Sequence, residues 1–247
     1  MNPEAGPGAL HVWSIPLEHP AHLAVGGEQW LDTAERSRAA RYGSEPARLE
    51  FVRTRGAVRT VLAAYTGLPP GRLPLGFGEH GKPLLAGAAG RVRFNVAHSG
   101  GMALLAVARG REVGVDVEAL RPDLPAARLA QRFYPPEDRA AVCEPGLADE
   151  EQLSRYVRLW TRKEAYVKAA GGRVVQGTAV PVGPLRPAIG LRISGPLGEC
   201  RISDVPVRDG WLASVAMMGA ARYTLTLRTW PEDLPATNGE HRVTVVH

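Results

Sequence analysis

The 247-residue chain carries a net charge of +5, with 45% hydrophobic and 22% charged residues. This balance is ordinary for a soluble globular protein and excludes a disordered chain. The positive charge suits polyanions, acidic proteins and phosphorylated small molecules without choosing among them. The two cysteines, without a C-x-x-C pair, argue against a disulfide framework or a structural zinc site and favour a reducing compartment.

No segment of the sequence has the pattern of a membrane or export signal. The opening MNPEAGPGAL lacks the basic region and apolar core of a secretory signal. The longest apolar run, WLASVAMMGAA at 211–221, is much shorter than a bilayer span. We therefore expect a soluble cytoplasmic protein with no membrane partner.

The first elements along the chain are a strand and two helices. The strand is predicted at 9–17 and the helices at 33–43 and 46–67. In the second helix, apolar residues recur near helical spacing until Gly67, which is a helix-ending residue. A turn-rich piece at 76–87 leads to two strands, 91–98 and 102–109, around the turn 99–101.

A similar order of strand, helix and strands then follows. A strand at 111–120 comes after a hairpin-like connection and precedes helices at 124–133 and 149–170. Four β segments then lead to a polar tail: 191–195, 200–207, 211–218 and 222–230. The repeated order predicts an α+β fold with one half at 1–110, a second at 111–230 and a loosely ordered tail at 231–247.

The strand REVGVDVEAL, 111–120, has two very different faces. Because alternate residues of a strand share a face, three valines line one side, and Gly114, Asp116 and Glu118 line the other. The two carboxylates would lie roughly 7 Å apart. The polar face of a solvated edge strand is one explanation. The other is a hard divalent cation such as magnesium, which proteins bind through a few carboxylates together with phosphate oxygens.

The helix segment RLWTRKEAYVKAAGG, 158–172, provides a possible third acid. Trp160, Glu164 and Lys168 are spaced by four and share one helix face. Glu164 and Lys168 alone could be a surface ion pair, but Trp160 on the same face indicates that this face is covered. Glu164 is thus a candidate third ligand, and Lys168 a candidate contact for a phosphate.

Several segments resemble elements of the Sfp-type 4′-phosphopantetheinyl transferases. GVDVE and WTRKEAYVKAAG are similar to the two signature motifs, G-V/I-D-V/I/L-E and W-x-x-K-E-A-x-x-K-x-x-G. FNVAHSG (94–100), GKP (81–83) and RFYPPED (132–138) resemble further elements of the family. The resemblance covers about residues 30–175, and its ordered elements together are far more specific than any one of them.

The resemblance implies a fold and an activity. The fold is two pseudo-symmetric α+β halves of one monomeric chain, with the active site in the cleft between them. The activity is Mg²⁺-dependent transfer of the 4′-phosphopantetheine arm of coenzyme A to a serine hydroxyl of an acyl- or peptidyl-carrier protein, releasing 3′,5′-ADP. Secondary metabolite biosynthesis is the expected setting.

The resemblance also implies roles for individual residues. Asp116, Glu118 and Glu164 correspond to the magnesium ligands, Lys168 to the lysine at the pyrophosphate, and Glu164 is our candidate base. The expected coenzyme A contacts are His98 near the phosphates, Lys82 and Pro83 near the adenine, and Arg38 and Arg48 at the 3′-phosphate, with Arg55 a competing choice. Ala97 stands where the family commonly has serine.

Two other functions use some of the same residues. A metal-dependent nuclease could use paired acids, a helix glutamate and a lysine, but FNVAHSG and GKP would have no role there, so we expect no nucleic-acid partner. A non-catalytic relative could bind coenzyme A or carrier protein without reaction. Intact acids at 116, 118 and 164 argue against that.

Overall fold

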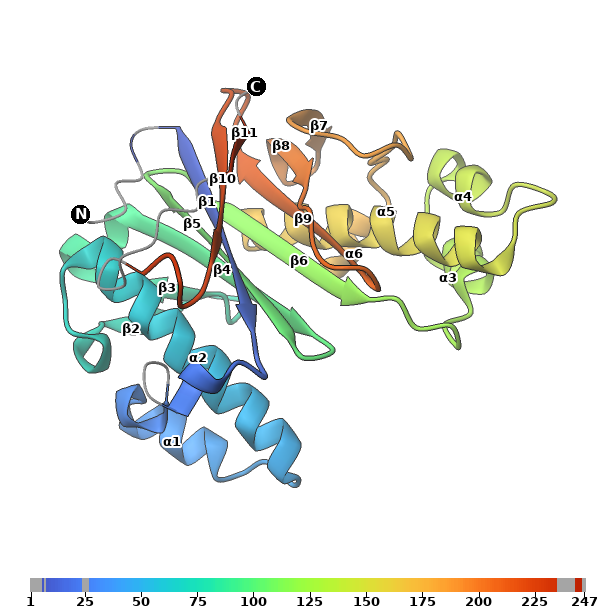
Figure 1. Cartoon of the computed structure of the whole chain (residues 1–247). Coiled ribbons are helices and arrows are strands. Elements are labelled where there is room, and N and C mark those ends of the chain that lie inside the picture. Colours follow the sequence, from blue (N-terminus) through green and yellow to red (C-terminus); the bar gives the residue numbers. More distant parts are fainter. Residues whose placement is uncertain (1–5, 7, 24–26, 235–242, 246–247) are drawn as a thin grey trace.

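The computed structural model describes residues 6, 8–23, 27–234 and 243–245. Two main β-sheets pack against each other, and each also packs against one long helix (Figure 1). Among these residues, every helix is too short or too polar to cross a membrane.

The first sheet has five strands in the order β11-β10-β1-β5-β4. Its strands are β1 (Ala9–Pro16), β4 (Val92–Ser99), β5 (Met102–Arg109), β10 (Thr224–Thr229) and β11 (Val243–Val245). Strands β4 and β5 form the predicted hairpin, in which Gly100 and Gly101 have φ values of 55° and 80°. Positive φ at both positions explains why glycine occupies this turn.

The second sheet has four strands in the order β6-β9-β8-β7. They are β6 (Val113–Ala119), β7 (Leu191–Gly195), β8 (Gly198–Asp204) and β9 (Trp211–Met218). The hairpin-like connection expected before β6 was wrong, because β6 leaves the first sheet and pairs with β9. Its free edge meets β4 through side chains: the Val115 amide donates to Asn95 Oδ1 at 2.9 Å.

Six α-helices are found in the described chain. They are α1 (Thr33–Ala39), α2 (Glu45–Thr66), α3 (Ala126–Phe133), α4 (Pro136–Val142), α5 (Asp149–Ala170) and α6 (Val174–Thr178). The two 22-residue helices, α2 and α5, end as predicted at Gly67 and Gly171, both in the left-handed conformation. The sequence did not predict α4, α6 or the small hairpin of β2 (Leu75–Phe77) and β3 (Pro83–Leu85).

The buried residues form three main layers of core. One lies between α2 and the first sheet and includes Val61, Leu62 and Trp13. The second joins the two sheets, where the β6 valines meet residues of the first sheet such as Leu104. The third lies between α5 and the second sheet. The order through the molecule is therefore α2, first sheet, second sheet, α5.

The predicted α+β class is confirmed, but the chain does not divide into sheets at residue 110. Strands β10 and β11 come from the predicted second half and tail, yet both belong to the first sheet. Residues 235–242 and 246–247 of the predicted tail lie outside the described residues. At the start of that tail, Leu234 is buried in the first core.

Candidate active site between β6 and α5

The acidic face of β6 is turned toward α5 rather than toward solvent. At Gly114, an added Cβ would lie 2.1 Å from the Ala165 carbonyl oxygen and 2.2 Å from the Ala169 amide nitrogen. Only glycine therefore lets the helix backbone rest on the strand. Asp116, two residues along, is left only 3% exposed. This excludes the explanation of a solvated edge strand for Asp116.

Burial and Lys168 shift the pKa of the Asp116 carboxyl in opposite directions. The pKa of Asp116 is raised to about 7 as the net result of burial, which raises it, the Lys168 ammonium, which lowers it, and the charges of Glu118 and Glu164, which raise it. Lys168 Nζ lies 2.5 Å from Asp116 Oδ1. Asp116 Oδ2 is buried without a hydrogen-bond partner among the described residues. A buried carboxylate oxygen of this kind costs free energy unless a cation or donor contacts it.

Helix α5 presents Glu164 and Lys168 to this carboxyl, as the spacing predicts. Glu164 is 8% exposed, and burial raises its pKa against the opposing charge of Lys168. Lys168 Nζ lies 3.9 Å from Glu164 Oε2. The two residues do form an i, i+4 pair, but it faces β6 and is shared with Asp116, so it is not a simple surface pair.

Glu118 is held by Ser99, a residue that the sequence analysis did not single out. Ser99 Oγ donates to Glu118 Oε2 and accepts from the Ala119 amide, both at 3.1 Å. The hydroxyl thus joins the end of β4 to the end of β6. The only signal in the sequence was its position directly after His98 in FNVAHSG.

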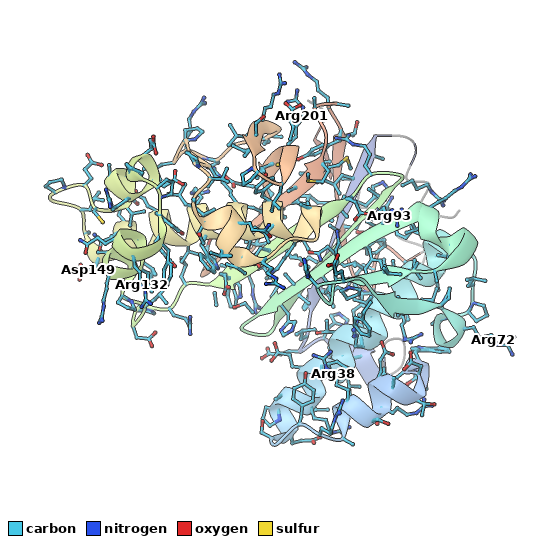
Figure 2. All side chains as sticks on the ribbon, turned by 180° about the vertical axis from the view of Figure 1, so that it is seen from behind. Arg38, Arg72, Arg93, Arg132, Asp149 and Arg201 are labelled. Atoms are coloured by element: carbon cyan, nitrogen blue, oxygen red, sulfur yellow. The ribbon has the colours of Figure 1, made fainter. Side chains whose placement is uncertain are left out.

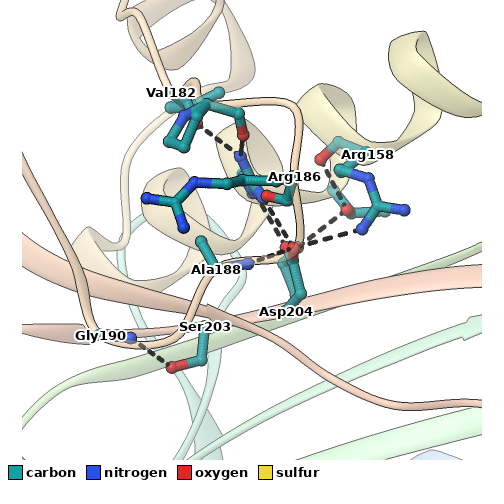
Figure 3. Close-up of polar contacts among 11 residues, drawn as sticks. Arg158, Val182, Arg186, Ala188, Gly190, Ser203 and Asp204 are labelled. Atoms are coloured by element: carbon teal, nitrogen blue, oxygen red, sulfur yellow. Dashed lines mark hydrogen bonds and ion pairs between the residues drawn. The ribbon is translucent and has the colours of Figure 1, made fainter.

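Helix α5 is fixed to its sheet by a buried arginine two residues before Glu164. Arg162 makes a bidentate ion pair with Asp204 of β8, at 2.9 and 2.7 Å. The same guanidinium donates to the carbonyl oxygens of Val182, Pro184 and Arg186. Figure 3 shows Asp204 at the centre of these contacts, with Arg158 and the Ala188 amide also directed at it. This network sets the position of Glu164 along the helix axis.

The residues expected near coenzyme A lie on the first-sheet side of the junction. His98, at the end of β4, is 53% exposed and contacts Glu50 of α2, with Nδ1 2.9 Å from Oε1. Pro83 lines a cavity of about 300 Å³ that also contacts the end of α5 at Gly171. The Lys82 ammonium, in contrast, is fully engaged by protein groups, among them the Glu112 carboxylate at 2.8 Å.

The three candidate arginines differ in their freedom to bind an anion. Arg38 and Arg55 lie over the Phe51 ring, 5.1 and 5.9 Å from its centroid. Arg55 is buried, which lowers its pKa, whereas Arg38 is exposed on the side of α1 and α2 (Figure 2). Arg48 is already paired with Glu45 and Glu28, at 2.8 and 3.3 Å. Among the described residues, none of the three arginines forms an ion pair with Asp116, Glu118 or Glu164.

Ala97 lies in the core between the two sheets and is 6% exposed. A serine hydroxyl in the same orientation would enter apolar surroundings. The alanine therefore fits its position as packing, and the polar contact at this end of β4 is made by Ser99.

The donor chemistry of the three acids suits magnesium. Carboxylate oxygens are the ligands this ion prefers, and Asp116 Oδ2 is buried and unpaired in the described part of the chain. In that same part, no three or more His, Cys, Asp or Glu side chains are already arranged closely enough to hold a metal ion. Ligation of magnesium by Asp116, Glu118 and Glu164 therefore stays a prediction.

Acids and a lysine gathered between β6 and α5 are residues that a metal-dependent enzyme can use on phosphorylated substrates. The family model of the 4′-phosphopantetheinyl transferase superfamily matches residues 112–182, which contain β6 and α5. The 4′-phosphopantetheinyl transferase HetI of Nostoc sp. is 34% identical over 212 residues, covering 85% of this chain and 88% of that protein. The chain belongs to the 4′-phosphopantetheinyl transferase superfamily and is an enzyme of this type.

Other relatives match a smaller part of the chain. The 4′-phosphopantetheinyl transferase of Bacillus subtilis is 30% identical over 125 residues, 51% of each chain. The 4′-phosphopantetheinyl transferase AcpT of Salmonella typhimurium is 36% identical over 104 residues, 42% of this chain and 53% of AcpT. The family resemblance seen in the sequence is confirmed.

Proposed function

We propose that this enzyme transfers the 4′-phosphopantetheine arm of coenzyme A to a serine hydroxyl of an acyl- or peptidyl-carrier protein, with Mg²⁺, and releases 3′,5′-ADP. The observation that carries the proposal is the contact between Lys168 and Asp116 beside Glu164. It joins the two signature motifs at one buried, highly charged place. Family membership supports the general transfer reaction.

The reaction requires one bond to form and one to break. The serine oxygen bonds to the phosphorus that carries the pantetheine arm, and the pyrophosphate bond to 3′,5′-ADP breaks. A serine hydroxyl is a weak nucleophile until a base accepts its proton, and we assign this role to Glu164, directly or through water. Lys168 would contact the pyrophosphate oxygens and offset charge on the leaving group.

Asp116, Glu118 and Glu164 would hold the magnesium ion. When bound, it would supply positive charge to the phosphoryl oxygens. Ser99 fixes the orientation of Glu118 through its hydroxyl. Gly114 lets α5 pack directly on β6, and the charges of Glu118 and Glu164 both act on Asp116. One copy of the chain would thus supply the oxygen ligands from both β6 and α5, so we propose a monomer.

The proposed coenzyme A contacts extend from this cluster toward the first sheet. His98 would contact the phosphates, and the loop at Lys82 and Pro83 would lie beside the adenine at the cavity it lines. For the 3′-phosphate, Arg38 is the better candidate of the two proposed arginines. Arg38 is exposed and stacks on Phe51, whereas Arg48 would have to break its ion pairs with Glu28 and Glu45 before it could bind the phosphate.

The first prediction concerns Asp116→Asn and Glu164→Gln. Each should lower the transfer rate by about 100-fold or more, because each removes a proposed oxygen ligand of Mg²⁺, and Glu164→Gln also removes the proposed base. The measurement is the mass of an apo-carrier domain after incubation with coenzyme A and Mg²⁺. Glu150→Gln, an exposed acid in the first turn of α5, is the control and should transfer normally.

Two results would contradict the proposal. If the unchanged protein leaves the mass of several apo-carriers unaltered, the transferase activity is wrong, and nicking of plasmid DNA would then favour the nuclease. A near-normal rate in a folded Asp116→Asn or Glu164→Gln variant would remove that residue from its role.

A further inference from the structure

Lys82 joins three separate segments of the chain through one ammonium group. Its Nζ donates to Glu112 Oε2 at 2.8 Å and to the carbonyl oxygens of Val113 and Ala169, both at 3.0 Å. An ammonium has three N–H donors, so all of them are used within the protein. The side chain is 17% exposed. The group is therefore already satisfied and is not free to bind a phosphate.

The Ala169 carbonyl is an end group of α5. The last four carbonyls of a helix have no partner within the helix and carry partial negative charge. Lys82 supplies both a donor and a positive charge to this end of α5, from a loop on the first-sheet side of the molecule. Ala169 follows Lys168 directly and is one turn beyond Ala165, which rests on Gly114.

The Val113 carbonyl is the corresponding contact on the strand. Val113 is the first residue of β6, three residues before Asp116. The same ammonium therefore contacts the beginning of the strand that carries two acids and the end of the helix that carries the third acid and the lysine. Glu112 completes the set and balances the charge.

We propose that Lys82 is a positioning residue that holds the C-terminal end of α5 against β6, and so places Lys168 and Glu164 beside Asp116. The inference rests on the proposed function for its effect on catalysis. In this role the Lys82 ammonium connects segments of the protein and does not bind the nucleotide. The adjacent backbone and Pro83 still line the cavity.

The test is Lys82→Met, a variant that keeps most of the side-chain volume and removes the donors. We expect kcat for carrier modification to fall by about ten-fold, because a displaced catalytic group loses rate steeply. The KM for coenzyme A and the Kd for 3′,5′-ADP should change less, within about two-fold, because only the pyrophosphate contact of Lys168 is loosened and the other nucleotide contacts are kept. If Lys82 were a nucleotide ligand instead, KM and Kd would rise and kcat would be kept.

A second measurement does not depend on activity. Amide hydrogen exchange of a peptide covering 166–172 should become about ten-fold faster in Lys82→Met, since the end of α5 opens more often, while a peptide from the first turns of α5 is unchanged. Lys82→Gln is measured in the same way if the methionine variant does not fold. Arg201→Met is the control: Arg201 also donates to two carbonyl oxygens, those of Ala220 and Gly190, but lies on β8, two strands from β6 (Figure 2).

The outcomes separate this inference from the proposed function. Unchanged exchange at 166–172, or a rise in KM and Kd at constant kcat, would overturn the role of Lys82 even if the unchanged protein is an active transferase. Absence of transfer by the unchanged protein would overturn the proposed function, and the exchange measurement would still decide whether Lys82 holds α5.

Discussion

At the scale of single residues, Gly114 and Asp116 depend on each other. The absence of a side chain at Gly114 lets the α5 backbone approach β6, and this approach buries Asp116 and raises its pKa. Lys168 then contacts the carboxyl from the same helix. The missing Cβ of Gly114 thus accounts for both the burial of Asp116 and its contact with Lys168.

Gly114→Ala should therefore damage the site as well as the fold. The new methyl group would meet backbone atoms of α5, which cannot rotate away, so we expect a loss of roughly 1–3 kcal/mol in the free energy of unfolding. Transfer should fall together with stability, because Lys168 is moved away from Asp116. The measurements are urea unfolding and the carrier assay.

Gly76→Ala is the matched control for that prediction. Gly76 lies in β2, and an added Cβ there would have its nearest neighbour, a Leu84 side-chain atom, at an ordinary 3.7 Å. Equal stability and activity for both alanine variants would show that the close approach at Gly114 does not position α5.

At the scale of elements, the buried pair of Arg162 and Asp204 connects α5 with β8. Burial by itself would raise the pKa of Asp204, but the hydrogen bonds and charge of Arg162 hold it below its ordinary value of 3.8. A carboxyl whose pKa is lowered by folding stabilises the native state above its unfolded pKa and loses that contribution as the pH falls through the native value.

Asp204→Asn should accordingly lower the free energy of unfolding by about 3–5 kcal/mol near neutral pH, because Arg162 is left buried without its partner. The difference from the unchanged protein should be constant from about pH 7 to pH 5 and shrink at lower pH, below the ordinary pKa. Chemical denaturation at several pH values measures it. Asp209→Asn, in an exposed turn, should show no such difference, and a pH-independent loss in Asp204→Asn would contradict the assignment.

The elements most easily predicted were those with strong local signals. Helix α5 was predicted over its full range, 149–170, because helical spacing and the glycines at 171 and 172 agree. Helices α4 and α6 have seven and five residues, too few for a strong periodic pattern, and α1, also seven residues long, was predicted only as part of a longer segment, 33–43. The partner of β6 was also missed, because an alternating pattern indicates a strand without saying which strand it pairs with.

At the scale of the whole molecule, the net charge of +5 bears on the approach of substrates. Coenzyme A is polyanionic, and an acidic carrier protein would be attracted by the same field. Long-range attraction of this kind raises the association rate and is screened by salt over about 10 Å at 0.1 M.

We predict that kcat/KM for an acidic apo-carrier falls several-fold as NaCl rises from about 0.05 M to about 0.5 M, while kcat changes little. Coenzyme A and Mg²⁺ are kept saturating so that only the encounter with the carrier is tested. A carrier variant in which surface acids are neutralised is the control and should lose this dependence. A kcat/KM that does not respond to salt would show that the charge plays no part in the encounter.

The α+β class, the long helices, the hairpin and the family were all accessible from the order of residues, because each depends on short-range spacing along the chain. Contacts between distant segments were not. The pairing of β6 with β9, the Ser99 bridge to Glu118 and the engagement of Lys82 by Ala169 join residues 19 to more than 80 positions apart. Such partners are determined by the shape and burial of the packed surfaces, for which a single sequence carries no local signal. The packing of α5 on β6 is also what makes the acidic strand face a buried site.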